Sequence, residues 1–359
     1  MTDRNRVRLL PPALREGDSI GIFSPSSDEA GRFPVRRDRA VLALEELGFR
    51  VVFAPGALRT GAYAAGSGRQ RAEDLHSLWQ APEVRAVIAA VGGNNCNRLF
   101  DLIDYELIAS TPKLLIGYSD TTALLTAVWV RTGLTTVMGP QLMPQFGEAG
   151  GCLDYTLRSF RSLLSNPRPV GEVMPSTQWT DERGDWTRQD EQLRGLTLTS
   201  APRTLRSGTA VGPAYGANLA TLLRLAGTTY WPDLTGHVVL LESSSSALSL
   251  LDAQLTQLRQ TGVLDRIAGL GFGRFPGTAT AERPGAPNGL DSLVREVFDG
   301  YAWPIVTGLD IGHTDPMFSV PYGAMAWLEA GDRVRFGFDE SAVQSPVAEK
   351  ADDPRLTYG

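Results

Sequence analysis

Histidine is scarce in this sequence, where three residues, at positions 76, 237 and 313, supply the side chain best suited to proton transfer near neutral pH. His76 falls within the helical apolar repeat of residues 69–79 and His237 opens an apolar strand, so we expect structural roles for both. His313 follows the predicted strand 305–309, within Gly-His-Thr-Asp-Pro. Loops at strand ends often carry chemistry, so His313 is the candidate base, with a turn-stabilising histidine as the competing interpretation.

A hydroxyl that a histidine could activate occurs at Ser119, in Gly-Tyr-Ser-Asp-Thr-Thr. It lies directly between the apolar stretch 114–116 and a predicted helix. A serine on such a turn lifts its hydroxyl clear of the sheet, and the N–H of Asp120 then points toward a developing oxyanion. Thr121 replaces the second glycine of the G-x-S-x-G elbow, and serine is also a common helix N-cap. The pattern predicts either a nucleophile or a cap.

Gly92 and Gly93 follow the predicted strand 86–91 and could supply a second oxyanion donor, because a loop without Cβ atoms exposes its N–H groups. The same pair could hold a phosphate. The run Gly-Gly-Asn-Asn-Cys-Asn lacks the G-x-G-x-x-G fingerprint, so it favours a dinucleotide site only weakly. A plain strand-to-helix turn is the simplest alternative.

The acid that would orient the histidine has several candidates. Glu242 ends the predicted strand 238–241, whereas Asp310 and Asp315 flank His313. A carboxylate at the second ring nitrogen fixes the tautomer and stabilises the imidazolium, and glutamate can do this as well as aspartate. Aspartate in a turn commonly serves the turn itself. Spacing alone leaves the choice open.

The elements that must position these residues alternate between strand and helix in the first half of the chain. Strand–helix alternation favours an α/β fold with a Rossmann-like parallel sheet, whose sites lie at the carboxyl ends of the strands. We therefore predict that residues 1–165 form a Rossmann-like domain that carries the nucleophile. Its predicted strands are 19–23, 50–53, 86–91 and 113–116, and its predicted helices are 36–47, 69–79 and a third that ends near residue 130.

The remainder divides into three parts. Residues 166–208 lack helical or strand periodicity and are predicted to be an inter-domain linker and substrate loop. Residues 209–340 are predicted to form a smaller β-rich α/β domain that carries the acid and the histidine, and residues 341–359 a loosely ordered tail. The predicted elements of the second domain are helices 218–225, 247–258 and 290–298, strands 237–241 and 305–309, and a hairpin of 324–328 with 333–338.

Composition excludes several classes of protein. A net charge of −6 argues against binding nucleic-acid polymers, and the apolar runs are too short for a membrane span. The polar N-terminus predicts no signal peptide, so we expect a cytoplasmic protein. Cys96 and Cys152 lack C-x-x-C spacing, which argues against a disulfide framework and a structural zinc site.

Three separated motifs resemble the serine peptidase family of LD-carboxypeptidases and microcin C immunity peptidases. They are Gly-Tyr-Ser-Asp-Thr-Thr, Leu-Leu-Glu-Ser, and Gly-His-Thr-Asp-Pro followed by Val-Pro-Tyr-Gly. Supporting stretches are I-G-I-F-S-P-S-S, A-A-V-G-G-N-N and Y-G-A-N-L-A-T-L-L-R-L-A-G-T. The resemblance covers roughly residues 10–338 and implies Ser119 as nucleophile, Glu242 as acid and His313 as base.

The resemblance also implies an oxyanion hole from the backbone of Gly92, Gly93 and Asp120, and a site between a Rossmann-like domain and a smaller β-rich domain. It implies a homodimer that needs neither a metal nor an organic cofactor. In this family the immunity-type members are longer than the murein-recycling ones. Their extra length is an extended inter-domain loop, which carries an aromatic residue that stacks on a nucleobase. Residues 166–208 match that loop, and Trp186 is the stacking candidate.

Two further substrate contacts are expected from the resemblance, Asn218 in Tyr-Gly-Ala-Asn-Leu and Ser243 at the start of a serine run where relatives can carry charged residues. The favoured function is hydrolysis of a microcin C-like aminoacyl nucleotide at an amide, acyl-sulfamoyl or phosphoramidate bond. The alternatives are removal of the terminal D-alanine from murein tetrapeptides, and nucleotide binding without catalysis. The expected partner is therefore a small peptide or peptidyl nucleotide.

Overall fold

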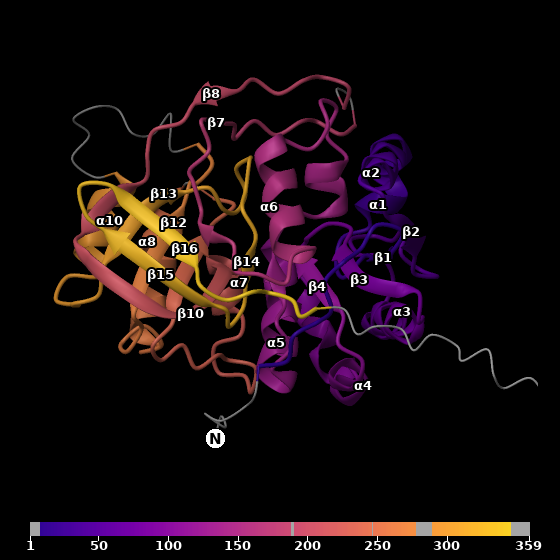
Figure 1. Cartoon of the computed structure of the whole chain (residues 1–359), viewed down its shortest axis with the longest axis horizontal. Coiled ribbons are helices and arrows are strands. Elements are labelled where there is room, and N and C mark those ends of the chain that lie inside the picture. Colours follow the sequence, from indigo (N-terminus) through magenta and orange to yellow (C-terminus); the bar gives the residue numbers. More distant parts are fainter. Residues whose placement is uncertain (1–7, 188–189, 246, 278–288, 346–359) are drawn as a thin grey trace, which may run out of the picture.

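The computed structural model describes residues 8–187, 190–245, 247–277 and 289–345. Two sheets lie side by side, with the N-terminal half of the chain on the right of Figure 1 and the C-terminal half on the left. The fold is mixed α/β, as the strand–helix alternation predicts. Among the helices of the described ranges, none combines the length and the apolarity that crossing a bilayer requires.

The N-terminal sheet has the order β14-β5-β4-β3-β1-β2, and β1 to β5 run parallel. Strands β1, β3 and β4 are fully or largely buried because helices cover the sheet, which explains their continuous apolar runs, whereas the edge strand β2 is partly exposed. The strands are β1 Ser19–Phe23, β2 Arg50–Phe53, β3 Val84–Ala89, β4 Leu114–Gly117 and β5 Val137–Met138. The helices of this half are α1 Glu29–Arg32, α2 Pro34–Glu46, α3 Gly68–Gln80, α4 Tyr105–Ser110, α5 Thr122–Thr132 and α6 Asp154–Leu164.

Shorter helical turns complete this half: the 3₁₀ turns Cys96–Leu102 and Ser119–Thr121, and a wider turn over Leu142–Phe146. The sixth strand of the sheet comes from the other half of the chain. Strand β14, Val320–Pro321, pairs antiparallel with β5. The two halves therefore share a sheet, which the sequence pattern did not predict.

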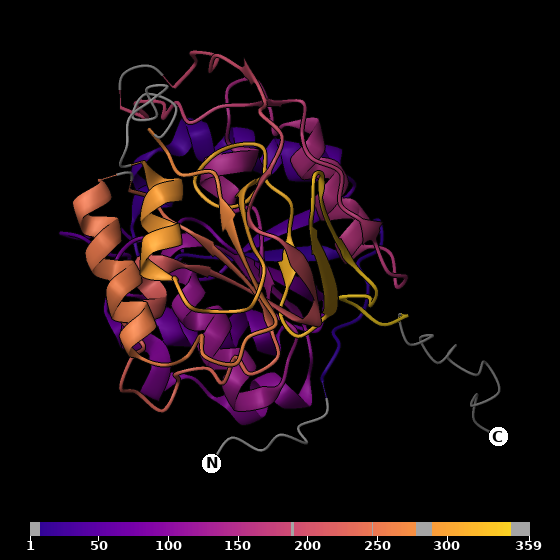
Figure 2. The ribbon, with the colours of Figure 1, turned by 90° about the vertical axis from the view of Figure 1, so that its left-hand side faces the viewer.

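The C-terminal sheet has the order β6-β16-β15-β10-β11-β12-β13-β9. Strands β10 to β13 run parallel, while the hairpin β15–β16 adds antiparallel strands at one side. Helices α8 Leu248–Gln260 and α10 Leu290–Val297 lie side by side in Figure 2, and α7 is Leu219–Leu223. The strands are β10 Gly208–Asn218, β11 Val238–Glu242, β12 Gly269–Gly273, β13 Ile305–Leu309, β15 Met325–Ala330 and β16 Val334–Phe338.

The inter-domain segment, residues 166–208, is more ordered than its lack of periodicity predicts. Its ends join the C-terminal sheet, as β6 Gly171–Glu172 beside β16 and β9 Arg203–Arg206 beside β13. Its middle forms a two-stranded ribbon, β7 Gln178–Trp179 with β8 Thr197–Leu198, and crosses to the N-terminal half above α6 (Figure 1). Strands this short leave no periodic signal in a sequence.

The first residues of the predicted tail, 341–359, belong to the folded structure. Ala342 and Val343 are buried in the core of the N-terminal half, and the N–H of Ala13 donates to the carbonyl of Gln344 at 2.9 Å. Residues 341–345 therefore belong to the folded body, while the rest of the predicted tail lies outside the described residues.

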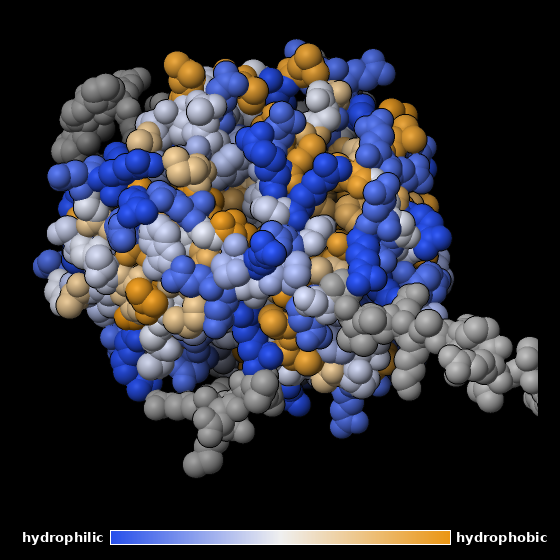
Figure 3. Space-filling view, in the orientation of Figure 1, coloured by the Kyte–Doolittle hydropathy of each residue, from blue (hydrophilic) through white to orange (hydrophobic). Residues whose placement is uncertain are grey.

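On the face shown in Figure 3, hydrophobic residues are scattered among hydrophilic ones.

Candidate active site

Ser119 sits on a strained turn at the carboxyl end of β4. Its φ is +60°, and it is the one non-glycine residue with positive φ among the described residues. Such strain is typical of a serine lifted out of a strand-to-helix turn. The amide of Gln141 supports the turn by donating to the Tyr118 carbonyl and the Thr121 hydroxyl, both at 2.9 Å. Tyr118 and Thr121 occupy the cap positions here, so the interpretation of Ser119 as a helix cap is wrong.

Ser119, His313 and Glu242 form one hydrogen-bonded line. His313 Nε2 lies 3.0 Å from Ser119 Oγ, and His313 Nδ1 lies 2.5 Å from Glu242 Oε2. Ser119 comes from the N-terminal half, whereas Glu242 ends β11 and His313 follows β13. Glu242 is fully buried, and Ser119 and His313 are partly exposed. A serine, a histidine and a carboxylate in this order can deliver an activated hydroxyl to a carbonyl carbon.

The two aspartates near His313 bind other groups. Asp310 accepts hydrogen bonds from Ser176 and pairs with Arg274, and Asp315 pairs with Arg194. Neither carboxylate bonds to His313 in the described structure. Of the three candidate carboxylates, Glu242 is the one that contacts the imidazole.

Gly312 makes room for that contact. Its φ is +93°, and a Cβ built on it would lie 2.5 Å from Glu242 Oε2. A side chain at this position would therefore meet both an unfavourable backbone conformation and the carboxylate itself. The glycine of Gly-His is needed so that the glutamate can reach the neighbouring histidine.

The predicted oxyanion residues lie beside the serine. A Cβ on Gly92 would lie 3.0 Å from Ser119 Oγ and 3.4 Å from the backbone nitrogen of Asp120, so Gly92 borders the serine hydroxyl. Within the described residues, the N–H groups of Gly93 and Asp120 donate to no protein acceptor. They are free for a substrate oxyanion. The Asp120 carboxylate is engaged elsewhere, with Cys96 N and Arg224 Nη1, each at 2.9 Å.

The predicted substrate contacts fall in different places. Asn218 ends β10 in register with Glu242, and its Oδ1 caps α7 by accepting from Thr221 N at 3.0 Å. Ser243 is buried next to Glu242, where its hydroxyl accepts from Ser245 N. Asn218 and Ser243 therefore lie beside Glu242, and their side chains hydrogen-bond to nearby backbone N–H groups and stabilise local turns.

Trp186 contacts the N-terminal half rather than the triad. Its ring lies edge-on to Phe33 with centroids 5.8 Å apart, and the Arg36 guanidinium lies 4.4 Å from its centroid. The ring is half-buried and lines an open groove of about 510 Å³ together with Arg32, Phe33, Pro34, Val35, Arg36, Thr187, Asp190 and Glu191. An aromatic wall and guanidinium groups thus share this groove.

The other two histidines have the structural roles that the sequence predicts. His76 Nε2 accepts the N–H of Asp104 at 2.9 Å, and His237 Nδ1 lies 3.1 Å from the Thr235 carbonyl. Burial lowers the pKa of both imidazoles. No group of three or more His, Cys, Asp or Glu suited to hold a metal ion gathers within the described ranges.

Sequence reasoning missed the polar residues that surround the triad. Gln145 Nε2 donates to the Tyr118 hydroxyl at 3.1 Å, and the Tyr118 ring meets the His313 ring edge-on with centroids 5.0 Å apart. Burial raises the pKa of the Tyr118 phenol. The Arg183 guanidinium donates to the Ser244 carbonyl at 2.9 Å. These contacts join distant parts of the chain, so no local pattern marks them.

Comparison with known proteins identifies the family. The sequence model of the LD-carboxypeptidase N-terminal domain matches residues 20–139, and that of the LD-carboxypeptidase C-terminal domain matches residues 211–328. The chain belongs to the LD-carboxypeptidase family. As a member of this family it is a serine-type carboxypeptidase, a hydrolase.

Its relatives within the LD-carboxypeptidase family carry two kinds of name. A putative carboxypeptidase of Vibrio cholerae is 35% identical over 326 residues, covering 89% of this chain and 95% of the relative. The microcin C7 self-immunity protein MccF of Escherichia coli is 32% identical, covering 88% of this chain and 91% of MccF. The structure of MccF in complex with glutamyl sulfamoyl guanosine matches with a TM-score of 0.86 at 29% identity, covering 94% of this chain and all of that one. The family resemblance predicted from the motifs is confirmed.

Proposed function

We propose that this carboxypeptidase hydrolyses microcin C-like aminoacyl nucleotides, cleaving the amide, acyl-sulfamoyl or phosphoramidate bond that joins the amino acid to the nucleotide, and so detoxifies them. The observation that carries the proposal is Trp186, which lines a groove with Phe33 and Arg36 on the segment expected to contact a nucleobase. The MccF structures contain aspartyl sulfamoyl adenosine and glutamyl sulfamoyl guanosine, which are compounds of this class.

Catalysis in this proposal uses protein groups alone. Ser119 Oγ attacks the carbonyl carbon while His313 Nε2 accepts the hydroxyl proton, and Glu242 stabilises the imidazolium through Nδ1. The free N–H groups of Gly93 and Asp120 hold the oxyanion of the tetrahedral intermediate. His313 then protonates the leaving nitrogen, which leaves an acyl-serine ester. Water, activated by His313, attacks that ester and restores Ser119.

Recognition of the nucleotide would come from Trp186. Stacking of a base on an aromatic side chain contributes roughly 1–3 kcal/mol, enough to select a nucleotide over a peptide. The ring is half-buried beside Phe33 and Arg36, so it is pre-positioned on a wall of the groove. In this proposal the ring is the base-binding wall, which the inter-domain segment brings over the N-terminal half.

Recognition of charge near the scissile bond would come from Arg183. Its exposed guanidinium donates to the Ser244 carbonyl, two residues beyond Glu242, and pairs with no carboxylate in the described part of the chain. The expected substrates are anionic there, whether through an acyl sulfamate, a phosphoramidate or a terminal carboxylate. Arg183 places a positive charge beside the serine run where relatives can carry charged residues.

The murein alternative is favoured by other relatives. A probable murein peptide carboxypeptidase of Bacillus subtilis is 30% identical over 338 residues, and the murein tetrapeptide carboxypeptidase of Pseudomonas aeruginosa is 28% identical over 278. Removal of a terminal D-alanine would use the same three residues. We do not propose nucleotide binding without catalysis, because the chain is a serine-type carboxypeptidase. The homodimer stays a prediction.

Mass spectrometry of the products tests the proposal. Wild type, Ser119→Ala and Trp186→Ala are each incubated with glutamyl sulfamoyl adenosine and with a murein tetrapeptide. We expect wild type to release sulfamoyl adenosine, Ser119→Ala to release none while melting like wild type, and Trp186→Ala to show a KM raised about 5-fold to 150-fold for the nucleotide. Hydrolysis of the murein peptide alone, unaffected by Trp186→Ala, would establish the alternative instead.

A further inference from the structure

The inter-domain segment meets the loop that carries His313 through a backbone bridge. The N–H of Thr180 donates to the Asp315 carbonyl at 2.7 Å, and the N–H of Asp315 donates to the Thr180 carbonyl at 2.9 Å. Asp315 lies two residues beyond His313. The segment therefore adds a short piece of antiparallel pairing to the loop that supplies the base.

The side chain of Asp315 strengthens this contact. Its Oδ2 accepts from Arg194 Nη1 at 2.7 Å, and its Oδ1 accepts from Gln145 Nε2 at 3.2 Å. Gln145 also donates to the hydroxyl of Tyr118, the residue that precedes Ser119 and contacts the His313 ring. Asp315 therefore joins the histidine loop to the turn that carries Ser119.

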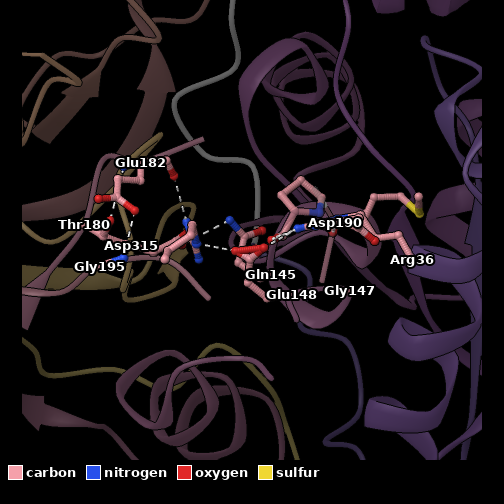
Figure 4. Close-up of polar contacts among 12 residues, drawn as sticks. Arg36, Gln145, Gly147, Glu148, Thr180, Glu182, Asp190, Gly195 and Asp315 are labelled. Atoms are coloured by element: carbon pink, nitrogen blue, oxygen red, sulfur yellow. Dashed lines mark hydrogen bonds and ion pairs between the residues drawn. The ribbon is translucent and has the colours of Figure 1, made fainter. Parts of the chain in front are cut away.

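Arg194 continues the network from Asp315 to Glu148, and Figure 4 labels Asp315, Glu148, Asp190 and Arg36 along it. Arg194 Nε pairs with one oxygen of Glu148, and Arg36 Nη2 pairs with the other oxygen at 2.7 Å. Arg36 also pairs with Asp190 and lies over the Trp186 ring. An unbroken chain of contacts thus runs from the groove of Trp186 to both loops of the triad.

These ion pairs lie largely out of water. The side chains of Arg194, Glu148 and Asp315 are exposed by 14%, 10% and 11%. Burial alone would lower the pKa of Arg194, but the carboxylates of Asp315 and Glu148 outweigh it and raise that pKa. Charge pairs with little exposure are held in one geometry far more firmly than pairs on the surface. The network can therefore fix positions.

We propose that Arg194 is a positioning residue, which holds the His313 loop against the Ser119 turn through Asp315 and makes the triad geometry depend on the docked inter-domain segment. The inference rests on the proposed roles of Ser119 and His313 but not on the identity of the substrate. Displacing a catalytic group by about 1 Å can cost about 100-fold in rate, so a loosened loop would lower kcat more than it changes KM.

The experiment compares Arg194→Gln with Arg335→Gln. Arg335 also bridges two carboxylates, Glu172 and Glu329, but it lies exposed on β16. The readouts are kcat and KM on whichever test substrate wild type hydrolyses, the rate of covalent labelling of Ser119 by a fluorophosphonate, and the melting temperature. Labelling needs the Ser119–His313 pair but no nucleotide or murein group, so it stands even if the proposed substrate is wrong.

For Arg194→Gln we expect kcat and the labelling rate to fall about 10-fold to 100-fold with KM changed less than about 3-fold, and for Arg335→Gln neither rate to change. Arg194→Lys, which keeps the charge but can reach fewer partners, should recover part of the loss. Equal rates in Arg194→Gln and Arg335→Gln would overturn the proposal.

A double variant guards against a simple folding defect. Arg194→Gln leaves Asp315 charged and without its guanidinium, whereas Arg194→Gln combined with Asp315→Asn removes both charges. We expect the double variant to regain the melting temperature and to remain slow. If it regains wild-type kcat as well, the loss in the single variant came from a stray buried charge, and the positioning role is refuted.

Discussion

Gly312 and Glu242 lie so close together that a single methyl group at residue 312 would occupy the space of the carboxylate, 2.5 Å from Oε2. This carboxylate is the group that reaches His313 Nδ1. The shortest contact of the triad therefore depends on a missing side chain in the residue next to the histidine.

Gly312→Ala should lower kcat/KM by about 100-fold or more, because the alanine must push Glu242 away from the imidazole. The matched control is Gly300→Ala, where φ is +84° and no atom lies within 4 Å of the added Cβ. Both substitutions carry backbone strain, but only the first displaces the carboxylate. Steady-state kinetics and melting curves of the two variants check this, and equal activity in both would contradict it.

Gly92→Ala tests the oxyanion hole. The new methyl group would lie 3.0 Å from Ser119 Oγ and 3.4 Å from Asp120 N, within the space that a tetrahedral intermediate needs. Loss of one oxyanion donor typically costs about 100-fold to 1,000-fold in kcat, and we expect a loss of that order. Single-turnover kinetics, which isolate acylation, measure it. A normal acylation rate would place the oxyanion hole elsewhere.

Arg183→Gln should weaken binding of anionic substrates. A hydrogen bond to a charged group contributes about 1.5–3 kcal/mol, which corresponds to a rise in KM of roughly 10-fold to 150-fold. Arg183→Lys should keep part of the affinity because it keeps the charge. Raising the salt concentration should raise the KM of wild type but affect Arg183→Gln less. An unchanged KM in Arg183→Gln would show that another group reads the charge.

His237 makes stability depend on pH far from the triad. Burial lowers the pKa of its imidazole in the folded state, so the unfolded chain binds more protons once the pH falls below about 6.5. The free energy of unfolding should therefore decrease from about pH 6.5 downward, and His76 adds a contribution of the same sign. His237→Asn should flatten this slope in urea titrations between about pH 5 and pH 7. A slope identical to that of wild type would rule out His237 as a source.

The sequence predicts those strands and helices whose own residues carry a clear apolar pattern. The predicted strands 19–23, 50–53 and 305–309 coincide with β1, β2 and β13. Strand β12, Gly-Leu-Gly-Phe-Gly, was missed because glycines are poor strand formers. A Cβ on Gly271 would lie 2.7 Å from a Leu240 methyl and 2.8 Å from a Leu309 methyl. Side chains of the neighbouring strands therefore require glycine at this position, and nothing within β12 itself signals that requirement.

The residues of the candidate site likewise fall into those that local motifs mark and those that only tertiary contacts reveal. Ser119 and His313 stand in local motifs, and the family resemblance selected Glu242. Arg194 could not be found from the sequence, because its ion pair with Asp315 spans 121 positions and an arginine on a polar loop looks like any solvated charge. Trp186 was predicted to stack on a nucleobase, and its contacts with Phe33 and Arg36 were not foreseen. Tertiary contacts of this kind have no signature in spacing.

Strand β14 carries a consequence for any attempt to divide the protein. Val320–Pro321 closes the edge of the N-terminal sheet by pairing with β5, and Tyr322 N donates to the Thr136 carbonyl at 2.9 Å. A fragment that ends before residue 320 would expose β5 as an open edge, a template for aggregation. The two halves should therefore unfold in one cooperative transition, and a hinge between them would have to break main-chain hydrogen bonds. We therefore expect access to Ser119 to depend on the loops around it more than on a separation of the two sheets.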